Sequence, residues 1–419
     1  MYWGKLISVT GAAQIIIQGL GFVSGILVLR LLSVDEYAYY TLANTMLGAM
    51  TVLADGGISI GVMSQGGKVW DNKEKLGGVL VTGLNLRKKF AIGSLIVCLP
   101  ILASQLWQHN ASWLMIALTV ASLIPAFYAA LSGSLLEIIP KLRQDVVPLQ
   151  KNQIVVSVLR ALLTAAFIFV FPFTFIALLA NGIPRIYGNI KLLKIVSPFA
   201  DTSQSIDPVV NKEILSVVKR ALPEIIYYCF SSQITVWIIT YFGNTKSVAE
   251  IGALSRLAAL LTIFNVILST LVIPRFAKLP QQKDILFKHF FQISAAIIFI
   301  LLIFITGIFC FSKEILWILG DKYAGLELEL FLSVLGACIN LIAGIIFNLY
   351  TSRGWVMNPL LAIISSISAI LIGVFIFDIK TLKGVLIFNI YLSIIQFFLQ
   401  SMYLLYKVSK VDKDIISHS

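Results

Sequence analysis

Apolar runs of about 18 or more residues recur along the whole chain, and this recurrence constrains its fold more than any other feature. Runs of this length are typical of helices that cross a membrane. The composition agrees, because 58% of the 419 residues are hydrophobic and only 12% are charged, whereas a soluble globular protein carries about 25% charged residues. With a mean hydropathy of +0.93, the chain has too much apolar surface for the cores of soluble domains. We therefore predict an all-α integral membrane protein.

The apolar runs predict twelve transmembrane helices, each about 20 residues or longer. The expected spans are 8–32, 38–63, 89–107, 112–137, 152–171, 173–196, 221–242, 248–275, 288–311, 325–350, 358–378 and 383–406. The longest polar stretch, 197–220, contains two prolines and predicts a cytoplasmic linker. It divides the chain into two six-helix bundles, residues 1–196 and 221–419.

Basic residues are distributed unevenly between the two sides that these spans define. If the N-terminus is cytoplasmic, 23 Lys and Arg residues fall inside and 5 fall outside. The positive-inside rule then predicts a multi-pass protein with both termini in the cytoplasm. The net charge of +12 does not indicate nucleic-acid binding, because the basic residues form short clusters between apolar runs.

Residues that would bind a metal or act as a nucleophile are scattered. The four cysteines lie inside apolar runs without a CxxC pair, and the three histidines lie in connecting segments. This pattern indicates small buried side chains and predicts neither a metal site nor a cofactor. We also find no nucleophile–base pair, so the chain is not expected to be an enzyme.

The two halves contain an internal similarity. The segment VDEYAYYTLANTML begins at Val34, and VAEIGALSRLAALL begins 214 residues later at Val248. Both segments open the second helix of their half on the outer side, which predicts a parallel pseudo-repeat. In transporters built this way the substrate is held near the midplane between the halves. We therefore expect a V-shaped molecule with a central cavity.

Three arginines inside predicted spans are the main candidates for substrate binding, because a charge in the bilayer is costly without a function. Arg160 shares a helix face with two hydroxyl residues, and Arg185 lies one turn from Asn181; Arg256 lies in the second copy of the repeat. For Arg160 the alternative is a structural ion pair, and for Arg185 it is snorkelling to the cytoplasmic side.

Four further residues have two interpretations each. Arg30 ends the first span and either binds substrate or snorkels outward, while Gln18 belongs to a polar stripe that lines a cavity or joins helices. Asp55 either couples transport to an ion or forms a salt bridge to an arginine. Glu224 follows Pro223, so it is either a second ion-coupling residue or an ordinary helix start.

The deep charges comprise more arginines than acids, so the predicted cavity is net positive and attracts an anion. Arginine also binds phosphate through two parallel hydrogen bonds. A pyrophosphate fits such a site, and neighbouring amides and hydroxyls suit attached sugars.

Two segments carry a family resemblance. RLLSVDEYAYYTLANTMLGAM, from Arg30 to Met50, and ILWILGDKYAGLELELFLSVLG, from Ile315 to Gly336, resemble polysaccharide exporters of the MOP superfamily (multidrug/oligosaccharidyl-lipid/polysaccharide). The chain departs from the pattern at Ala38, where the family usually has Gly. The resemblance implies a flippase in the bacterial inner membrane. It would move undecaprenyl-pyrophosphate-linked oligosaccharide, an O-antigen or capsule unit, from the cytoplasmic to the outer leaflet.

The resemblance also implies partners: the lipid-linked oligosaccharide, the lipid bilayer, a polysaccharide polymerase and a chain-length regulator, but no nucleic acid. The driving force stays open between Na⁺, H⁺ and the membrane potential alone. One alternative is a cation-coupled multidrug exporter of the same superfamily, which would need an acidic cavity. A membrane polysaccharide-assembly enzyme would need a long outer loop or clustered carboxylates, and a peptidoglycan-precursor flippase typically has fourteen helices.

Overall fold

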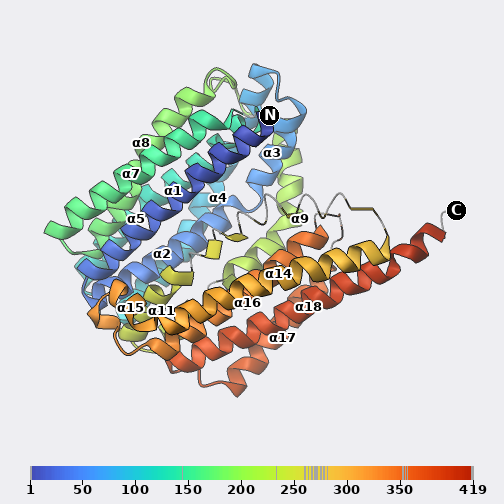
Figure 1. The fold of residues 1–419 in the computed structure, drawn as a ribbon. Helices are drawn as coiled ribbons and strands as arrows, with labels where there is room; N and C mark the ends of the chain where they lie inside the picture. Colours follow the sequence, from blue (N-terminus) through green and yellow to red (C-terminus); the bar gives the residue numbers. More distant parts are fainter. Residues whose placement is uncertain are drawn as a thin grey trace. The chain divides into compact units, whose positions relative to one another are not determined.

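The computed structural model consists of α-helices joined by short connections (Figure 1). It describes residues 2–143, 145–232, 234–258, 261–262, 264–265, 268, 272–273, 276, 279–280, 282–351, 353, 355 and 357–416. Within these ranges the side chains of 2–10, 146, 224, 228, 230–232, 359 and 411–416 are outside the description. No strand occurs in the described part of the chain, which confirms the predicted all-α class.

Two compact units are present, Met1–Ala249 and Glu250–Ser419. The first contains α1 (Tyr2–Leu31), α2 (Val34–Asp55), α3 (Ile58–Lys68), α4 (Lys73–Gln108), α5 (Trp113–Leu136), α6 (Ile138–Leu142), α7 (Val146–Val170), α8 (Thr174–Val196), α9 (Pro208–Ser232), α10 (Ile234–Phe242) and the start of α11 (Thr245–Ala258). The second contains α14 (Lys283–Cys310), α15 (Ser312–Leu319), the 3₁₀ turn η1 (Asp321–Tyr323), α16 (Glu327–Thr351), α17 (Pro359–Ile376) and α18 (Leu382–Ile416).

The long helices pack side by side within each unit. In the first unit α5 packs on α8, α1 and α8 pack on α7, and α2 packs on α4 (Figure 1). In the second unit α18 packs on α14, α16 and α17. Among the described residues, seven helices are long and apolar enough to cross a membrane, or eight if the bent pair α2–α3 is one span. The chain is therefore a multi-pass membrane protein.

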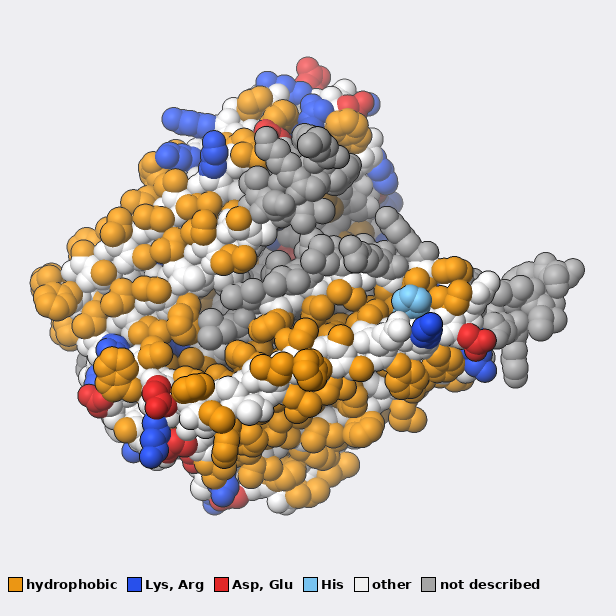
Figure 2. Space-filling view, in the orientation of Figure 1, with side chains coloured by type: hydrophobic (Ala, Val, Ile, Leu, Met, Phe, Trp, Pro, Cys, Tyr) orange, Lys and Arg blue, Asp and Glu red, His pale blue; other side chains and the backbone are white. Residues whose placement is uncertain are grey.

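The outer surfaces of the helices are apolar. Ile96 is 69% exposed on α4, Phe169 is 79% exposed on α7 and Phe375 is 89% exposed on α17. Figure 2 shows hydrophobic side chains along the helices, with many of the Lys and Arg side chains near helix ends. A continuous apolar surface of this extent is stable against lipid chains and unfavourable in water.

Several predicted boundaries are wrong. The expected span 38–63 is broken at Gly56 and Gly57, where α2 meets α3 at 45°. The expected span 89–107 begins sixteen residues earlier, at Lys73, so Arg87 lies in a helix and not in a loop. The expected linker 197–220 becomes helical at Pro208, because Asp207 caps α9 by accepting from the backbone N–H groups of Val209 and Val210. The division after Ala249 reflects packing only, so the bundle boundary, the repeat and the orientation stay predictions.

Several helices in the first unit begin with an ordinary side-chain cap, and one helix start is also joined to another helix. Asn72 and Ser112 accept from backbone N–H groups three residues later and so cap α4 and α5. Ser33 caps α2 in the same way, accepting from the N–H of Glu36. The Glu36 carboxylate, however, accepts from both the N–H and the hydroxyl of Thr174, each at 2.6 Å. Glu36 therefore ties the start of α2 to the start of α8.

A buried histidine connects four elements at the same end of the first unit. Nε2 of His109 lies 3.1 Å from the carbonyl oxygen of Thr240, and Nδ1 lies 3.0 Å from the Thr245 hydroxyl. The hydroxyl of Tyr39 donates to the carbonyl of His109 at 3.1 Å. Because a carbonyl can only accept, Nε2 carries the proton and Nδ1 accepts from Thr245. Burial lowers the pKa of His109, which keeps the ring neutral at pH 7.

We predict that acidification destabilises the protein through His109. Since its pKa is lower in the folded than in the unfolded state, the unfolded chain takes up the proton first as the pH falls below about 6.5. Unfolding in detergent should therefore occur at a lower temperature at pH 5.5 than at pH 7.5. The variant His109→Gln should lose part of this difference, and His289→Gln should keep it. Equal pH dependence in both variants would contradict the assignment.

A second prediction concerns adjacent glycines near the start of α4. A Cβ on Gly77 would overlap the backbone of Asp201, whose N–H donates to the carbonyl of Lys73, whereas a Cβ on Gly78 meets nothing within 4 Å. Gly77→Ala should therefore cost about 1–3 kcal/mol of unfolding free energy. Gly78→Ala should be neutral or stabilise by up to about 1 kcal/mol, because alanine favours a helix. Denaturant unfolding of both variants tests the contact, and equal stabilities would contradict it.

Candidate functional site

Two polar clusters lie among the apolar helices of the first unit. One surrounds Arg87 on α4, and the other surrounds Arg185 on α8. Among the described residues no three His, Cys, Asp or Glu side chains come together in a way that would hold a metal ion. The chemistry of both clusters is therefore that of a guanidinium and its partners.

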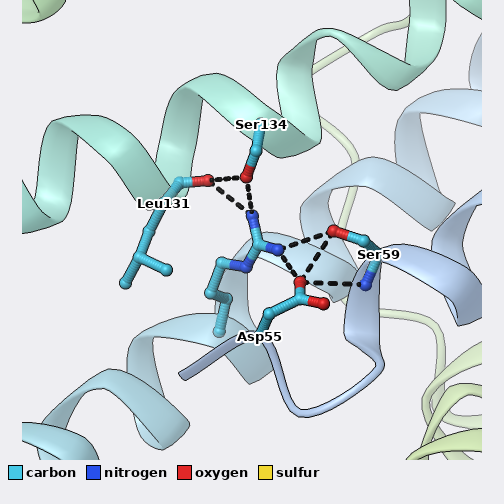
Figure 3. Close-up of polar contacts among 5 residues, drawn as sticks. Asp55, Ser59, Leu131 and Ser134 are labelled. Atoms are coloured by element: carbon cyan, nitrogen blue, oxygen red, sulfur yellow. Dashed lines mark hydrogen bonds and ion pairs between the residues drawn. The ribbon is translucent and has the colours of Figure 1, made fainter. Parts of the chain in front are cut away.

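Arg87 is only 3% exposed and is held by groups from three elements. Its Nη1 donates to the carbonyl of Leu131 at 2.5 Å and to the Ser134 hydroxyl at 2.6 Å, both on α5. Its Nη2 donates to the Ser59 hydroxyl at 2.7 Å and forms an ion pair with Asp55. Figure 3 shows Asp55, Ser59, Leu131 and Ser134 converging on the guanidinium.

Asp55 is the last residue of α2, directly before the break at Gly56 and Gly57. Its carboxylate accepts from the N–H and the hydroxyl of Ser59 on α3, at 3.2 and 2.7 Å. The ion pair and these hydrogen bonds hold α2, α3 and α4 together. Of the two sequence interpretations of Asp55, the salt bridge to an arginine is therefore present. Its predicted role in ion coupling is untested.

The second cluster lines a cavity of about 280 Å³ between α5, α7 and α8. Close helix packing around it depends on small residues. A Cβ on Gly182 would lie 3.0–3.4 Å from atoms of Ala126, including its backbone, so α5 and α8 approach closely there. On the other side of the cavity Gly188 leaves room for Val156 of α7.

Amide side chains form much of the polar lining. Asn189 donates to the carbonyl of Ala129 at 2.7 Å and to the Ser132 hydroxyl at 3.0 Å. Asn152 donates to the carbonyl of Gly188 at 3.0 Å, while its own side-chain oxygen is buried and has no hydrogen-bond partner among the residues that the structure describes. Such an oxygen is costly to bury unless a ligand or water donates to it.

Glu137 is the acidic residue of the cavity, and it is already paired. It accepts from Lys141 at 2.9 Å and from Gln153 at 2.8 Å. The side chain of Lys141 is 47% exposed, so this pair contributes little stability.

Arg185 interacts electrostatically with Tyr40 and Glu137. Its guanidinium forms no hydrogen bond or ion pair with any other residue that the structure describes. It therefore presents its donors to the cavity, unlike Arg87, whose Nη1 and Nη2 both donate to other residues. An uncommitted guanidinium among amides can bind an oxyanion together with hydroxyl-bearing groups.

The other predicted site residues are dispersed. Asn181 lies one turn from Arg185 and donates to the Tyr40 hydroxyl at 3.1 Å and to the carbonyl of Ala177 at 2.9 Å. Arg160 lies against α1, where a Cβ on Gly21 would be 3.2 Å from its Nη2. Gln18 and Arg30 are exposed on α1. Their predicted substrate contacts are untested.

Two predicted site residues cannot be placed with the others. Arg256 is half-buried on α11 and belongs to the second unit. The side chain of Glu224 lies outside the described residues, so its two interpretations stay open.

Sequence reasoning missed Arg87, Asn152 and Gln153. Arg87 was assigned to a loop because the basic residues at 87–89 are typical of a cytoplasmic connection. Asn152 and Gln153 are the first residues of the expected fifth span, where polar side chains are ordinary, whereas α7 begins at Val146 and places both inside the helix. The run Gln150-Lys151-Asn152-Gln153 was the available signal, because several amides in one helical turn are unusual in an apolar span.

Comparison with known proteins identifies the fold. No protein-family model matches the chain, and no curated protein matches it. The lipid II flippase MurJ in an inward closed conformation has a TM-score of 0.74 at 15% identity, covering 96% of this chain and 87% of that one. An inward-facing MATE family multidrug resistance transporter of the MOP superfamily has a TM-score of 0.69 at 15% identity, covering 94% and 96%.

A third similar structure is a MOP superfamily transporter from Pyrococcus furiosus, for which reverse polarity of the binding pocket suggests a different function. Its TM-score is 0.65 at 13% identity, with coverage of 97% of this chain and 96% of that one. At such identities the likeness shows the fold alone. The chain has the twelve-helix fold of MOP superfamily transporters.

We predict that the Asp55–Arg87 pair stabilises the first unit. Removing one partner of a buried pair costs about 3–5 kcal/mol, which we reduce to about 2–3 kcal/mol because the Asp55 side chain is 27% exposed. Asp55→Asn should lower the free energy of unfolding in detergent by that amount, and Asp71→Asn, at an exposed acid, should not. Adding Arg87→Gln to Asp55→Asn should cost less than Arg87→Gln alone costs the wild type. Additive losses would show that the pair contributes nothing.

Proposed function

We propose that the chain is a flippase that moves a lipid-linked oligosaccharide, attached through pyrophosphate, from the cytoplasmic to the outer leaflet by alternating access. The supporting observation is the uncommitted guanidinium of Arg185 in a cavity of about 280 Å³ lined by amides. A phosphate oxygen can accept from the guanidinium, and sugar hydroxyls can bond to Asn152, Gln153 and Asn189.

The fold supports the same class of function without specifying the cargo. One structure with the same fold is a lipid II flippase, and another is a multidrug transporter. We propose that the cargo of this chain is the anionic one, an O-antigen or capsule unit, because the acids at the two clusters are engaged. Asp55 is paired with Arg87, and Glu137 is bonded to Lys141 and Gln153.

The remaining parts of the sequence prediction enter the proposal unchanged. Arg160 and Arg256 are proposed to contact the pyrophosphate during the cycle, with Arg30, Asn181 and Gln18 as further contacts. Asp55 and Glu224 are the proposed ion-coupling residues, and the inner membrane of a bacterium is the proposed location. A polymerase and a chain-length regulator are the proposed partners.

Export of organic cations is the second candidate, and Glu137 is the observation that favours it. A carboxylate in the cavity could hold a cation if Lys141, whose side chain is 47% exposed, moves away. Glu137→Gln should then abolish efflux, whereas for a flippase the substitution should leave glycan export intact.

The proposed function can be tested in the host by deleting the gene and extracting lipid-linked glycans. A flippase predicts a glycan that accumulates on the inner leaflet and is cleared by the wild-type gene. Arg185→Gln should weaken binding roughly tenfold to hundredfold, because a charge-assisted contact contributes about 1.5–3 kcal/mol. Membrane levels should stay normal, since Arg185 has no described hydrogen-bond or ion-pair partner to lose.

Two further variants show whether the effect is specific to the guanidinium of Arg185. Arg185→Lys keeps the charge without the planar fork, so partial export is expected. Arg220→Gln removes the same charge from an exposed position on α9 and should export normally. Normal export by Arg185→Gln would exclude the anion site, and unaltered glycans in the deletion strain would exclude the flippase.

A further inference from the structure

Three connections of the first unit meet around Arg143, at the end that the charge pattern predicts to be cytoplasmic. Arg143 lies between α6 and α7, Trp70 lies between α3 and α4, and Phe199 lies between α8 and α9. The guanidinium carbon is 5.2 Å from the ring centre of Trp70 and 5.4 Å from that of Phe199. Two aromatic contacts hold the guanidinium in a fixed place.

Of the two aromatic rings beside Arg143, that of Phe199 packs against the protein interior and that of Trp70 is exposed. Phe199 and Leu142 pack against the buried cluster that includes Leu76, Leu135 and Ile139. Trp70 is 48% exposed, so its ring borders the surroundings of the protein. Tryptophan is enriched at the headgroup level of membranes because its ring is apolar and its N–H is polar.

Arg143 has no polar partner for its side chain within the described part of the chain. Its Nε is buried without an acceptor among the described residues, and none of their carboxylates lies within ion-pairing distance of the guanidinium. Two acids of the connection between α8 and α9 and of α9 are engaged elsewhere, whereas Asp145, half-buried two residues after Arg143, forms no ion pair with it. Hydrogen bonds from Ser203 and Gln204 lower the pKa of Asp201 to about 2, and Glu213 pairs with Lys68.

Arg353 in the second unit also lies beside two aromatic rings, but its guanidinium donates hydrogen bonds to backbone carbonyls. It follows the end of α16, and it lies 5.9 Å from the ring centre of Phe276 and 5.4 Å from that of Trp355. Its Nη1, however, donates to the carbonyls of Phe276 and Leu279 at 3.0 and 3.1 Å. Backbone carbonyls therefore occupy donors of Arg353, while the corresponding donors of Arg143 have no described acceptor.

We propose that Arg143 and Trp70 form a binding site for the phosphate of an anionic phospholipid in the adjacent leaflet. The guanidinium donates to two oxygens of a phosphodiester, and the exposed Trp70 ring packs against the glycerol and upper acyl region. Exposed Lys73 and Lys75 add positive charge, but exposed Asp71 and Glu74 offset it, so selectivity comes from the guanidinium. This site is separate from the Arg185 cavity and does not depend on which cargo the protein moves.

The test is native mass spectrometry of the purified full chain in neutral detergent. Phosphatidylglycerol, phosphatidylcholine and inorganic phosphate are titrated separately, and the bound equivalents are counted. The wild type should bind phosphatidylglycerol more tightly than phosphatidylcholine, and Arg143→Gln should weaken the first equivalent of phosphatidylglycerol roughly tenfold. Arg220→Gln is the matched control and should bind like the wild type, because its exposed side chain lacks the aromatic contacts.

Each remaining outcome decides the proposal. If Arg143→Gln does not fold, Trp70→Leu replaces it, and a threefold or greater loss of phosphatidylglycerol is expected because the guanidinium is no longer held. Unchanged phosphatidylglycerol binding in the folded variant, or an equal loss in Arg220→Gln, would overturn the site. Binding of inorganic phosphate that depends on Arg143, with lipid binding that does not, would overturn the lipid assignment.

Discussion

The structure depends on one constraint: a charge among apolar helices must be neutralised by the protein itself, because lipid chains offer no hydrogen bonds. Arg87 satisfies this constraint with a carboxylate, two hydroxyls and a backbone carbonyl from α2, α3 and α5. Its partners also fix the helix break, because Asp55 and Ser59 lie on either side of Gly56 and Gly57. The same contacts therefore fix the break between α2 and α3 and neutralise the charge of Arg87.

The arginines of this protein differ in how many of their guanidinium donors have an acceptor within the protein, and their expected roles differ accordingly. Arg87 and Arg353 donate to groups of their own unit and so hold segments together. Arg185 and Arg143 have neighbours that position them but, among the described residues, no acceptor. We expect the first pair to contribute to stability, and we propose that the second pair offers its donors to a ligand. The residue type alone does not separate these roles, because the partners come from distant parts of the sequence.

The helical class could be predicted from hydropathy, and the position of Arg185 one turn from Asn181 from helical spacing, because both are local properties. The start of α4 could not, since the basic run 87–89, which lies inside the helix, is typical of a connection between two spans. The partner of Asp55 could not be predicted either, because Arg87 lies 32 residues further along and only the packing of α2 on α4 brings the two together. The stacking of Arg143 required three connections to meet, which no periodicity in the sequence indicates.

The apolar outer surface has a consequence for how such a sequence can change over time. A lipid-facing position such as Phe375 or Ile96 must be apolar, but its shape is unconstrained, so one aliphatic or aromatic residue can replace another. Positions that do require one residue include Gly56 and Gly57, which have φ angles of 50° and 93°; a side chain on either would press against Phe90 or Ala221. A fold whose lipid-facing positions accept any apolar residue can persist while much of the sequence changes. This explains how transporters with TM-scores of 0.65–0.74 share only 13–15% of their residues with this chain.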